Sequence, residues 1–332
     1  MKSLKFTLAL ILTAALVNAQ AKEDDKVVSL ATKVEVDIHA TDELISAMDV
    51  KTDLRGTCIL VRSHNPTQAM VDRIVAWQLD VVAAGGFLMA SVDSTSPRGR
   101  LAVERLSAAL GSSHLVHSYT ETMLVRAYPV LNELRDAMHV AAPQWKRWAG
   151  GPEATLAWGF HNEALGLWYN NLGAERRESI DYVWVMEDDV GVAGGLPELV
   201  AEYQTDAADL LGASGDPVST GWVWHDVVSA EYARRYPLPQ RRFAPEMVQR
   251  FSTRLLVGLH TLSREEGVSA WSEQATPTLC RHLDFRCSTF RPENLGERFH
   301  GGEKRFTREE WNDIIQEVRD EDSARLYHAL KF

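Results

Sequence analysis

The sequence predicts an α/β fold, with a mostly parallel central sheet and helices on both of its faces. Three observations lead to this prediction. Short apolar, β-branched runs end in polar residues, as buried strands do. Stretches with apolar residues at helical spacing separate these runs, and proline or glycine marks several boundaries. Alternating strands and helices connect by right-handed crossovers, which build a parallel sheet covered by helices.

The elements behind this prediction follow one another from Gly56 onward. Strands are predicted at 57–65, 87–95, 114–120 and 181–189, with helices at 66–86, 98–113 and 154–175 between them. Pro66 stands near the start of the first helix, and Gly85 and Gly86 end it. The 332 residues, 45% of them hydrophobic, suffice for a sizeable core.

Polar residues gather at the carboxyl ends of three predicted strands. In an open α/β sheet these ends share one edge, and ligands bind there. We therefore expect Arg62–Asn65, Asp93–Thr95 and Glu187–Asp189 to lie together. This edge is the predicted functional site.

Glu187, Asp188 and Asp189 directly follow the apolar run Tyr182–Met186. Carboxylates crowded at the end of a buried strand repel one another, and their pKa values rise unless a cation compensates. Mg²⁺ or Mn²⁺ supplies that compensation and leaves coordination positions for water and phosphate. Alternation along the strand places Glu187 and Asp189 on one side and Asp188 on the other.

Two further interpretations of this stretch concern its surroundings. Gly191, Gly194 and Gly195 follow the acids and would let the backbone approach a bulky ligand. Alternatively, the acids only begin a solvated turn, or cap a helix at 196–203 near its positive end. In that case no metal is needed.

At this point the sequence resembles the glycosyltransferases of the GT-A fold. An apolar strand that ends in Glu-Asp-Asp, after a half rich in β–α units, is similar to their nucleotide-sugar-binding half over about residues 56–305. In those enzymes a short acidic motif, commonly Asp-x-Asp and in some families Glu-Asp-Asp, binds Mn²⁺ or Mg²⁺ against the donor diphosphate. The resemblance implies one domain from 56 to 332, with a Rossmann-like nucleotide-sugar half at 56–195 and an acceptor half at 196–305. It also implies Asp189 as the direct metal ligand, with Glu187 beside it.

The resemblance further implies transfer of a sugar from a nucleotide donor, expected to be a UDP-sugar, to a hydroxyl of a glycan or glycoprotein. The metal stabilises the diphosphate leaving group. At the strand ends, Arg62, His64 and Asp188 would contact the nucleotide. Asp93 would accept a hydrogen bond from a ring N–H of uracil or guanine. Ordinary loop polarity is the alternative explanation for Arg62, His64 and Asp93.

Glu273 is the first candidate for the base that an inverting enzyme needs. It stands between Trp271 and a turn expected at Pro277, in a segment similar to the one that carries the catalytic glutamate in some inverting GT-A enzymes. The alternative is that Ser272 and Glu273 only cap a helix. Asp226 is the second candidate for the base.

Trp222 and Trp224 are candidates for contact with the acceptor sugar. They are two residues apart, so a strand at 221–228 would place both on one face. Exposed aromatic rings pack against the C–H faces of sugars, whereas buried rings fill the core. Burial is the default in a chain with ten tryptophans.

The stretch 296–306 carries residues to which the resemblance assigns roles. It implies His300 as a further metal ligand and Lys304, next to Arg305, as a contact to the diphosphate. A solvated loop of mixed charge is the alternative. Residues 307–330 are expected to form an amphipathic helix, with Thr307 and Glu310 as a capping box and packing as its role.

The N-terminus has the features of a secretory signal over residues 1–21. Lys2 and Lys5 precede the apolar stretch Phe6–Val17, and Ala19–Ala21 is a cleavage site of small residues. The stretch is short for a membrane span, and an uncleaved anchor is the alternative. Residues 22–55 read as a stem. We therefore expect the Golgi or ER lumen of the secretory pathway, or secretion, with no stable membrane span after cleavage.

The three cysteines are consistent with an oxidising compartment. Cys280 and Cys287 could close a small disulfide loop there, with Cys58 a buried free thiol in a strand. Three unpaired core cysteines are the alternative.

Charge and motifs narrow the alternatives. A net charge of −11 argues against a general nucleic-acid-binding surface. A glycoside hydrolase with Glu187 and a second carboxylate as acid and base is an alternative that experiment can test. So is a non-catalytic secreted protein that binds carbohydrate or metal, although EF-hand spacing is absent.

Overall fold

The computed structural model describes residues 52–332 apart from 142–154, 213–214, 298, 300–304 and 321–322. The predicted signal peptide, most of the predicted stem, and the candidates His300 and Lys304 lie outside the described residues. The signal, the stem and the cellular compartment therefore stay predictions. Among the described residues, we find no helix with the length and apolarity that a membrane crossing requires.

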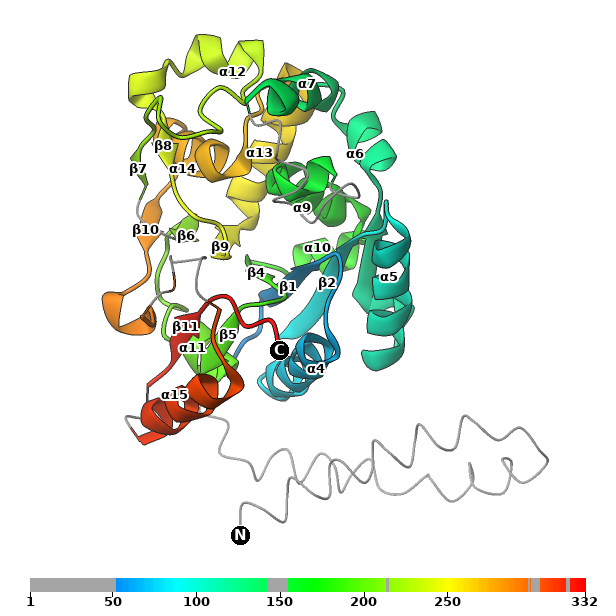
Figure 1. Ribbon diagram of the computed structural model, residues 1–332, viewed down its shortest axis with the longest axis vertical. Helices are drawn as coiled ribbons and strands as arrows, with labels where there is room; N and C mark the ends of the chain where they lie inside the picture. The colour runs from blue at the N-terminus through cyan, green and yellow to red at the C-terminus, as the bar shows by residue number, and fades with distance from the viewer. Residues whose placement is uncertain (1–51, 142–154, 213–214, 298, 300–304, 321–322) are drawn as a thin grey trace, which may run out of the picture. The chain divides into compact units, whose positions relative to one another are not determined.

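A seven-stranded sheet forms the centre of the described residues (Figure 1). In spatial order the strands are β10 (Cys287–Thr289), β6 (Leu210–Gly212), β9 (Val248–Ser252), β4 (Tyr182–Glu187), β1 (Thr57–Ser63), β2 (Phe87–Asp93) and β3 (Val116–Tyr119). Six strands run in one direction, and β9 is antiparallel to both of its neighbours. The predicted mostly parallel α/β fold is confirmed.

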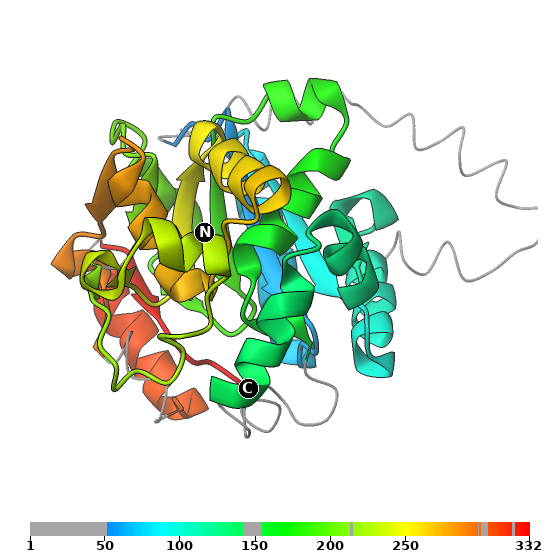
Figure 2. The ribbon, with the colours of Figure 1, turned by 90° about the horizontal axis from the view of Figure 1, so that it is seen from above.

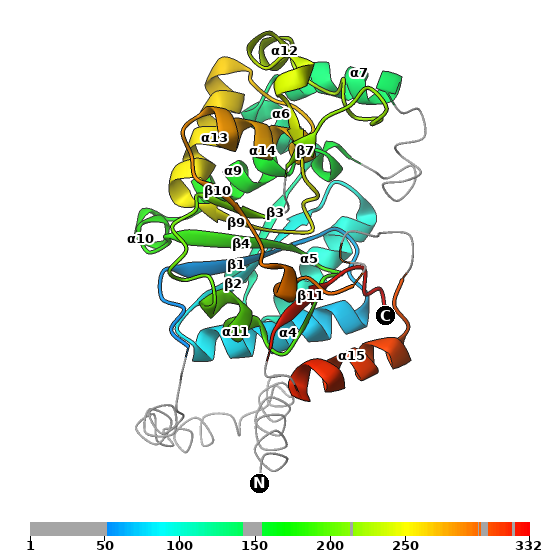
Figure 3. The same ribbon diagram turned by 90° about the vertical axis from the view of Figure 1, so that its left-hand side faces the viewer.

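Helices cover both faces of this sheet (Figures 1 and 3). One face carries α4 (Gln68–Ala83), α5 (Pro97–Ala109) and α11 (Leu196–Ala201), and the other carries α9 (His161–Asn171), α13 (Thr253–Glu266) and α14 (Ser272–His282). Figure 2 shows α13, in yellow, in front of the strands. Because side chains alternate along a strand, Ile59 packs with the first group of helices and Leu60 with the second. Both faces are buried, so the strand ends remain for ligand binding.

Smaller elements complete the described chain. They are α6 (Glu121–Ala127), α7 (Leu131–Ala141), α10 (Ala174–Glu178), α12 (Ala230–Arg235), α15 (Arg308–Asp320), β5 (Gly191–Ala193), β7 (Asp216–Pro217), β8 (Arg242–Phe243) and β11 (Arg325–Tyr327), with short 3₁₀ turns at 113–115, 156–158, 238–240 and 292–294.

Helix α4 illustrates how the local sequence sets the element boundaries. The side chain of Thr67 accepts a hydrogen bond from the backbone N–H of Met70 and caps the first turn. At the other end Gly85 has a φ of +82°, which glycine adopts without strain, and its N–H bonds the carbonyl of Val82. The predicted start and stop of this helix are confirmed.

The long helix predicted at 154–175 is interrupted. The chain instead forms a 3₁₀ turn at Leu156–Trp158, followed by α9 and α10. Gly159 separates the turn from α9, and a Cβ at this position would lie only 2.5 Å from the Trp271 ring. Packing of Trp271 against the bare backbone therefore fixes the break.

Pro277 was predicted to mark a turn, but it lies inside helix α14. A proline has no N–H to donate to the carbonyl four residues earlier, which here belongs to Glu273. The backbone N–H of Ala244 takes that place, at 2.9 Å from the Glu273 carbonyl oxygen. This contact ties α14 to the loop before β9.

Two other predicted elements differ from the structure. Residues 221–226 form turns and only Val228 makes a single β-bridge, so Trp222 and Trp224 do not share a strand face. The predicted helix at 307–330 ends at Asp320, and β11 follows it. Its predicted capping box is present, because Thr307 and Glu310 exchange backbone-to-side-chain hydrogen bonds.

The glycines after the acidic run make room for protein and not for a ligand. A Cβ on Gly191 would lie 2.8 Å from Trp311 and 2.9 Å from Leu330. Gly194, with a φ of +98°, would place its Cβ 2.0 Å from the carbonyl oxygen of Ser323. Both positions admit the chain around β11, which pairs antiparallel with β5.

A disulfide joins Cys280 at the end of α14 to Cys287 at the start of β10, and Cys58 is a buried free thiol. Both observations agree with the pairing considered from the sequence.

Candidate functional site

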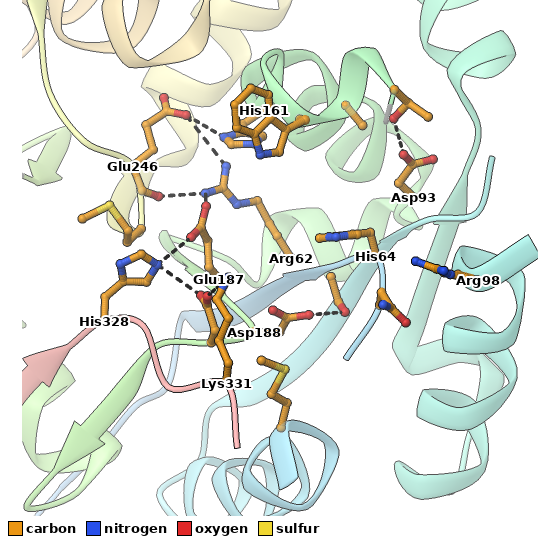
Figure 4. A pocket seen from close by; sticks show the side chains of 18 of the residues that line it. Arg62, His64, Asp93, Arg98, His161, Glu187, Asp188, Glu246, His328 and Lys331 are labelled. Atoms are coloured by element: carbon orange, nitrogen blue, oxygen red, sulfur yellow. Dashed lines mark hydrogen bonds and ion pairs between the residues drawn. The ribbon is translucent and has the colours of Figure 1, made fainter. Parts of the chain in front are cut away.

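A cavity of about 680 Å³ opens at the carboxyl ends of β1, β2 and β4 (Figure 4). The three polar strand ends predicted to meet do line it together, with Arg62–Asn65, Asp93 and Glu187–Asp189 all in its wall. Because β1 pairs with β4 in parallel, Arg62 stands directly opposite Glu187. The size is typical of a small-molecule site.

Two of the three acids point to one histidine. His328 Nε2 lies 3.4 Å from Glu187 Oε2 and 3.3 Å from Asp189 Oδ1. One ligand atom from each of the three residues falls within 4.8 Å of the others, a spacing that a single metal ion can bridge. The sequence did not identify His328.

Asp188 turns the other way, as strand alternation predicts. Its Oδ2 accepts a hydrogen bond from Ser63 Oγ at 2.5 Å, and its backbone carbonyl accepts one from Arg73 at 2.8 Å. Burial raises the pKa of Asp188 to about 6, and the charges of Asp189 and Glu187 add to this rise. Asp188 therefore binds the protein scaffold and not the histidine.

Residues 325–331, called here the 325–331 segment, bring a second cation to the acids. Lys331 Nζ lies 3.1 Å from Asp189 Oδ2. The segment is held by the β5–β11 pairing and by the N–H of Leu330, which donates to the Asp189 carbonyl at 2.7 Å. Packing was the expected role of residues 307–330, and that interpretation is incomplete because two side chains of this segment reach the acids.

The donor atoms at this point suit a divalent metal. Asp189 is only 6% exposed, and His328 Nε2, at 3.3 Å, faces its buried Oδ1. A buried carboxylate oxygen is costly unless a cation meets it, and a metal ion could replace the imidazolium there. Two carboxylates with one imidazole favour Mn²⁺ over Mg²⁺, since Mg²⁺ prefers oxygen ligands.

The acids and the histidine shift one another's pKa values. Burial disfavours the imidazolium, but the hydrogen bonds to Asp189 and Glu187 and their charges raise the pKa of His328 to about 9. Burial likewise opposes ionisation of Asp189, yet His328 and Lys331 lower its pKa to about 2. Imidazolium and ammonium thus neutralise the acids, and a metal ion would take over that role from the imidazolium.

A buried network connects the acids to the other side of the cavity. Arg62 donates to Glu187 Oε1 at 3.3 Å and to the Glu246 carbonyl at 2.8 Å. The Glu246 side chain is 3% exposed, lies 2.6 Å from His161 Nδ1, and accepts from Thr276 at 3.1 Å. Burial raises the pKa of Glu246 to about 7. Figure 4 shows Arg62 between Glu187 and Glu246, with His161 beyond.

Glu273 lines the same cavity from the first turn of α14. Its Oε2 accepts a hydrogen bond from Trp271 Nε1 at 3.1 Å. Burial and then the nearby charge of Glu246 raise the pKa of Glu273 to about 8. A carboxyl with such a pKa can hold or accept a proton near neutral pH.

Asp93 is largely engaged by the protein. Thr95 donates to its Oδ1 from the backbone N–H at 3.0 Å and from the hydroxyl at 2.6 Å, while Thr155 donates to its Oδ2. A carboxylate offers about four acceptor positions, so one remains for a ligand. His64 lines the same cavity.

Other predicted site residues lie elsewhere. Asp226 is outside the cavity wall, and its side chain is 77% exposed and paired with His225. Trp222 is half-buried, and its ring packs 4.7 Å from that of Phe243. Trp224 does line the cavity but is only 5% exposed. Arg305 lines the cavity too.

The residues that sequence reasoning missed carry signals of different strength. Glu246 is an isolated acid between apolar residues just before β9, so a buried charge could have been suspected there. His161 begins a helix and has no distinguishing pattern. His328 lies inside the stretch 307–330 that was predicted to be an amphipathic helix, and Lys331 directly follows it. Only the β5–β11 pairing brings these two residues to the acids.

Comparisons with known proteins give distant structural likeness only. No protein-family model and no curated protein matches the chain. The fold is similar to a mannosyltransferase from Pyrobaculum calidifontis in complex with GDP-Man and Mn²⁺, with 12% identity and a TM-score of 0.36 over 86% of this chain and 66% of that one. It is also similar to a mannosyltransferase from S. cerevisiae, with 9% identity and a TM-score of 0.39 over 74% and 70% of the two chains.

A third similar structure is core-mannan synthase A from Aspergillus fumigatus in its Mn/GDP form, with 9% identity and a TM-score of 0.36 over 72% and 76% of the chains. The protein spans just under two thirds of the archaeal enzyme's length. Likeness at these scores carries no functional assignment.

Proposed function

We propose that the protein is a metal-dependent glycosyltransferase that moves a sugar from a nucleotide-diphosphate donor to a hydroxyl of a glycan or glycoprotein. The observation that carries this proposal is the meeting of Glu187, Asp189 and His328 at the edge of a parallel sheet. The same cavity holds Glu273, a half-buried carboxyl whose raised pKa suits proton transfer. Metal ligands and a base are the parts that such a transfer requires.

The donor belongs on the side of the acids. Glu187, Asp189 and His328 would hold the metal, expected to be Mn²⁺, which supplies charge stabilisation for the diphosphate leaving group. Lys331, already at 3.1 Å from Asp189, would donate to other diphosphate oxygens. We expect UDP as the nucleotide, with Asp93 toward a ring N–H and with Arg62 and His64 beside it.

The acceptor hydroxyl belongs on the side of Glu273. Once ionised, this carboxylate would take the hydroxyl proton as the oxygen attacks the anomeric carbon from the face opposite the diphosphate, with inversion. Its raised pKa makes it a stronger base than an exposed glutamate. Its Oε2 is oriented by the Trp271 N–H.

A metal-free glycoside hydrolase fits the same residues less well. Its acid would have to carry a proton near neutral pH. Burial favours the proton on Glu187, but His328 and Arg62 lower its pKa below the usual value. Glu187 would therefore be ionised, so Glu273 would have to be the acid of such a hydrolase, and Asp189 and His328 would have no part in its chemistry.

The testing experiment measures thermal unfolding with UDP, with Mn²⁺ and with both. We expect UDP and Mn²⁺ together to raise Tm more than the sum of the separate effects, because the metal bridges protein and diphosphate. Asp189→Asn should lose this joint effect. The matched control, Asp226→Asn, changes an exposed carboxylate outside the cavity and should keep it.

A panel of UDP- and GDP-sugars with Mn²⁺, assayed for release of the nucleoside diphosphate, then identifies the donor. Stabilisation by free sugars alone, with no effect of nucleotide and metal, would favour a hydrolase or a lectin and contradict the proposal.

A further inference from the structure

Three tryptophans form one wall of the cavity, and they come from parts of the sequence other than the acidic run Glu187–Asp189. Trp158, Trp224 and Trp271 all line it. The rings of Trp224 and Trp271 stack with centroids 3.9 Å apart, and Trp158 stands edge-to-face against both, at 5.8 and 5.2 Å. Trp224 and Trp271 are 5% and 3% exposed, whereas Trp158 is half-buried. Trp158 is therefore the member of the cluster that can present ring surface to a ligand.

The backbone holds this wall rigidly. The N–H of Trp271 donates to the Val227 carbonyl, and the N–H of Ser272 donates to the Gly159 carbonyl, both at 2.9 Å. Gly159 also lets Trp271 pack closely against the backbone next to Trp158. A preorganised aromatic surface loses little conformational freedom on binding, which favours affinity.

A single carboxyl is joined to this wall. Trp271 Nε1 donates to Glu273 Oε2 at 3.1 Å, so the aromatic surface and the carboxyl are fixed together. The cations of the cavity come from other elements: Arg62 and His64 from β1 and its end, Arg98 from α5, and Arg305 and Lys331 from the chain around α15 and β11. Figure 4 shows Arg62, His64 and Lys331 around Glu187 and Asp188. One part of the cavity thus suits phosphate, and the other suits a neutral ring that carries hydroxyls.

We propose that Trp158, backed by Trp224 and Trp271, is the acceptor subsite, and that it seats a pyranose ring whose hydroxyl reaches Glu273. A pyranose has an apolar C–H face that packs on an aromatic ring and hydroxyls that bond carboxylates. This subsite deepens the proposed function and rests on it for the role of Glu273.

A nucleobase is the competing occupant of Trp158, because bases also stack on aromatic rings. The pyranose is favoured because the tryptophan wall lies beside Glu273. The wall itself supplies no cationic side chain for the phosphates that a nucleobase would bring with it. The two occupants give opposite results in a nucleotide-binding measurement.

The experiment compares wild type with Trp158→Ala, Trp158→Phe and Trp222→Ala. The last is the control, since Trp222 is half-buried but lies outside the cavity wall. Methyl α- and β-pyranosides of several configurations serve as probes. Saturation-transfer NMR on the metal-free protein measures their binding, and release of nucleoside diphosphate in their presence measures acceptor use.

We expect Trp158→Ala to weaken pyranoside binding and raise the acceptor KM by about tenfold, with a smaller effect in Trp158→Phe and none in Trp222→Ala. The joint effect of UDP and Mn²⁺ on Tm should stay as in wild type for all folded variants. Trp158→Phe keeps an aromatic ring and tests the site if the alanine variant does not fold.

Three results would overturn the subsite. They are the absence of pyranoside binding and of pyranoside-stimulated nucleoside diphosphate release in wild type, pyranoside binding in both Trp158 variants equal to that of wild type, and weakened UDP binding in these variants. Pyranoside binding that depends on Trp158, without turnover of any sugar nucleotide, would leave the subsite standing and remove the transferase proposal.

Discussion

His328 is the residue whose protonation controls the candidate metal centre. In the metal-free protein its pKa is raised to about 9, so the imidazole is mostly protonated at neutral pH. A metal must displace that proton, and metal binding is then expected to tighten about tenfold between about pH 7 and about pH 8. Isothermal titration of Mn²⁺ at the two pH values measures this.

His328→Gln is the corresponding variant, because it keeps a polar side chain without a titrating ring. We expect weaker Mn²⁺ binding in it and little change in affinity between the two pH values. A slope equal to that of wild type would show that His328 is not the group that releases the proton.

Glu273 determines the pH dependence of the proposed transfer. A base must be ionised, and the pKa of this carboxyl is raised to about 8 by burial and by Glu246. We therefore expect kcat/KM to fall as pH decreases below about 8 and to level off above it. Glu273→Gln should lose at least about a hundredfold in kcat and keep its UDP and Mn²⁺ binding.

Asp226→Asn is the control here as well, with an unchanged pH profile expected. If Glu273→Gln retains transfer within about tenfold of wild type, Glu273 is not the base. Glu246, whose pKa is raised to about 7, would then be the candidate.

Lys331 links the acids to the diphosphate in the proposal. Its side chain is 44% exposed, and its ammonium nitrogen lies 3.1 Å from Asp189 Oδ2. Lys331→Met keeps the apolar stem and removes the charge, so we expect UDP affinity in the presence of Mn²⁺ to fall about tenfold. Fluorescence titration with UDP measures this.

Arg319→Met, at an exposed position of α15, is the control for the Lys331 variant and should leave UDP affinity unchanged. Equal losses in both variants would mean that net charge, and not a local contact, sets the affinity.

At the scale of elements, the pairing of β5 with β11 supports the metal centre. Gly194 permits it, since a Cβ there would lie 2.0 Å from the Ser323 carbonyl oxygen. Gly194→Ala is expected to push the 325–331 segment away from β5 and to weaken Mn²⁺ binding by about tenfold or more, with no ligand changed. Isothermal titration checks the loss.

Gly111 offers a matched control for this substitution. It also has a positive φ, +71°, but apart from its two chain neighbours none of the described residues has an atom within 4 Å of the position that a Cβ would take there. Gly111→Ala therefore carries the same kind of backbone strain without displacing a neighbour. Unchanged Mn²⁺ affinity in both variants would contradict the dependence of the site on this pairing.

The sequence predicted well those elements whose pattern is local. The runs ending at Arg62, Asp93 and Glu187 are apolar over a whole strand, so their direction and their common edge follow from the alternation of strands and helices. The break at Gly159 could not be predicted in this way. It depends on Trp271, which reaches Gly159 only through tertiary packing.

At the scale of the molecule, stability should depend on the charges gathered in the cavity. Between about pH 6.5 and about pH 9, Glu246, Glu273 and His328 release protons in the folded metal-free protein. In the unfolded chain the glutamates are already ionised and the histidine loses its proton near about pH 6.5. The folded state therefore binds more protons over this range, and its stability falls as pH rises. We expect Tm to decrease over this range.

The double variant Glu246→Gln, Glu273→Gln should show a flatter decrease in Tm, measured by calorimetry without metal. Asp226→Asn should follow the wild-type curve. A Tm that rises over this range in wild type would mean that the two glutamates are ionised throughout.

The candidate site as a whole was only half predictable. Its acids at the end of β4 lie in one continuous motif. His328 and Lys331 instead come from the C-terminal stretch, which was predicted to be an amphipathic helix with packing as its role. Their approach depends on a three-residue strand, β11, pairing with another of three residues, β5. Such short strands carry too little pattern to be recognised from sequence. His300 and Lys304, which resemblance implied instead, lie outside the described residues.

The attachment of the 325–331 segment has a consequence for local opening of the fold. Detachment of β11 would carry His328 off the acids and so remove one of three ligands from a bound ion. Ion binding and fraying of this strand therefore oppose each other, and the coupling free energy is the same in both directions. A saturating concentration of the ion would stabilise the pairing of β11 with β5, and any partner that detaches β11 would weaken binding of the ion.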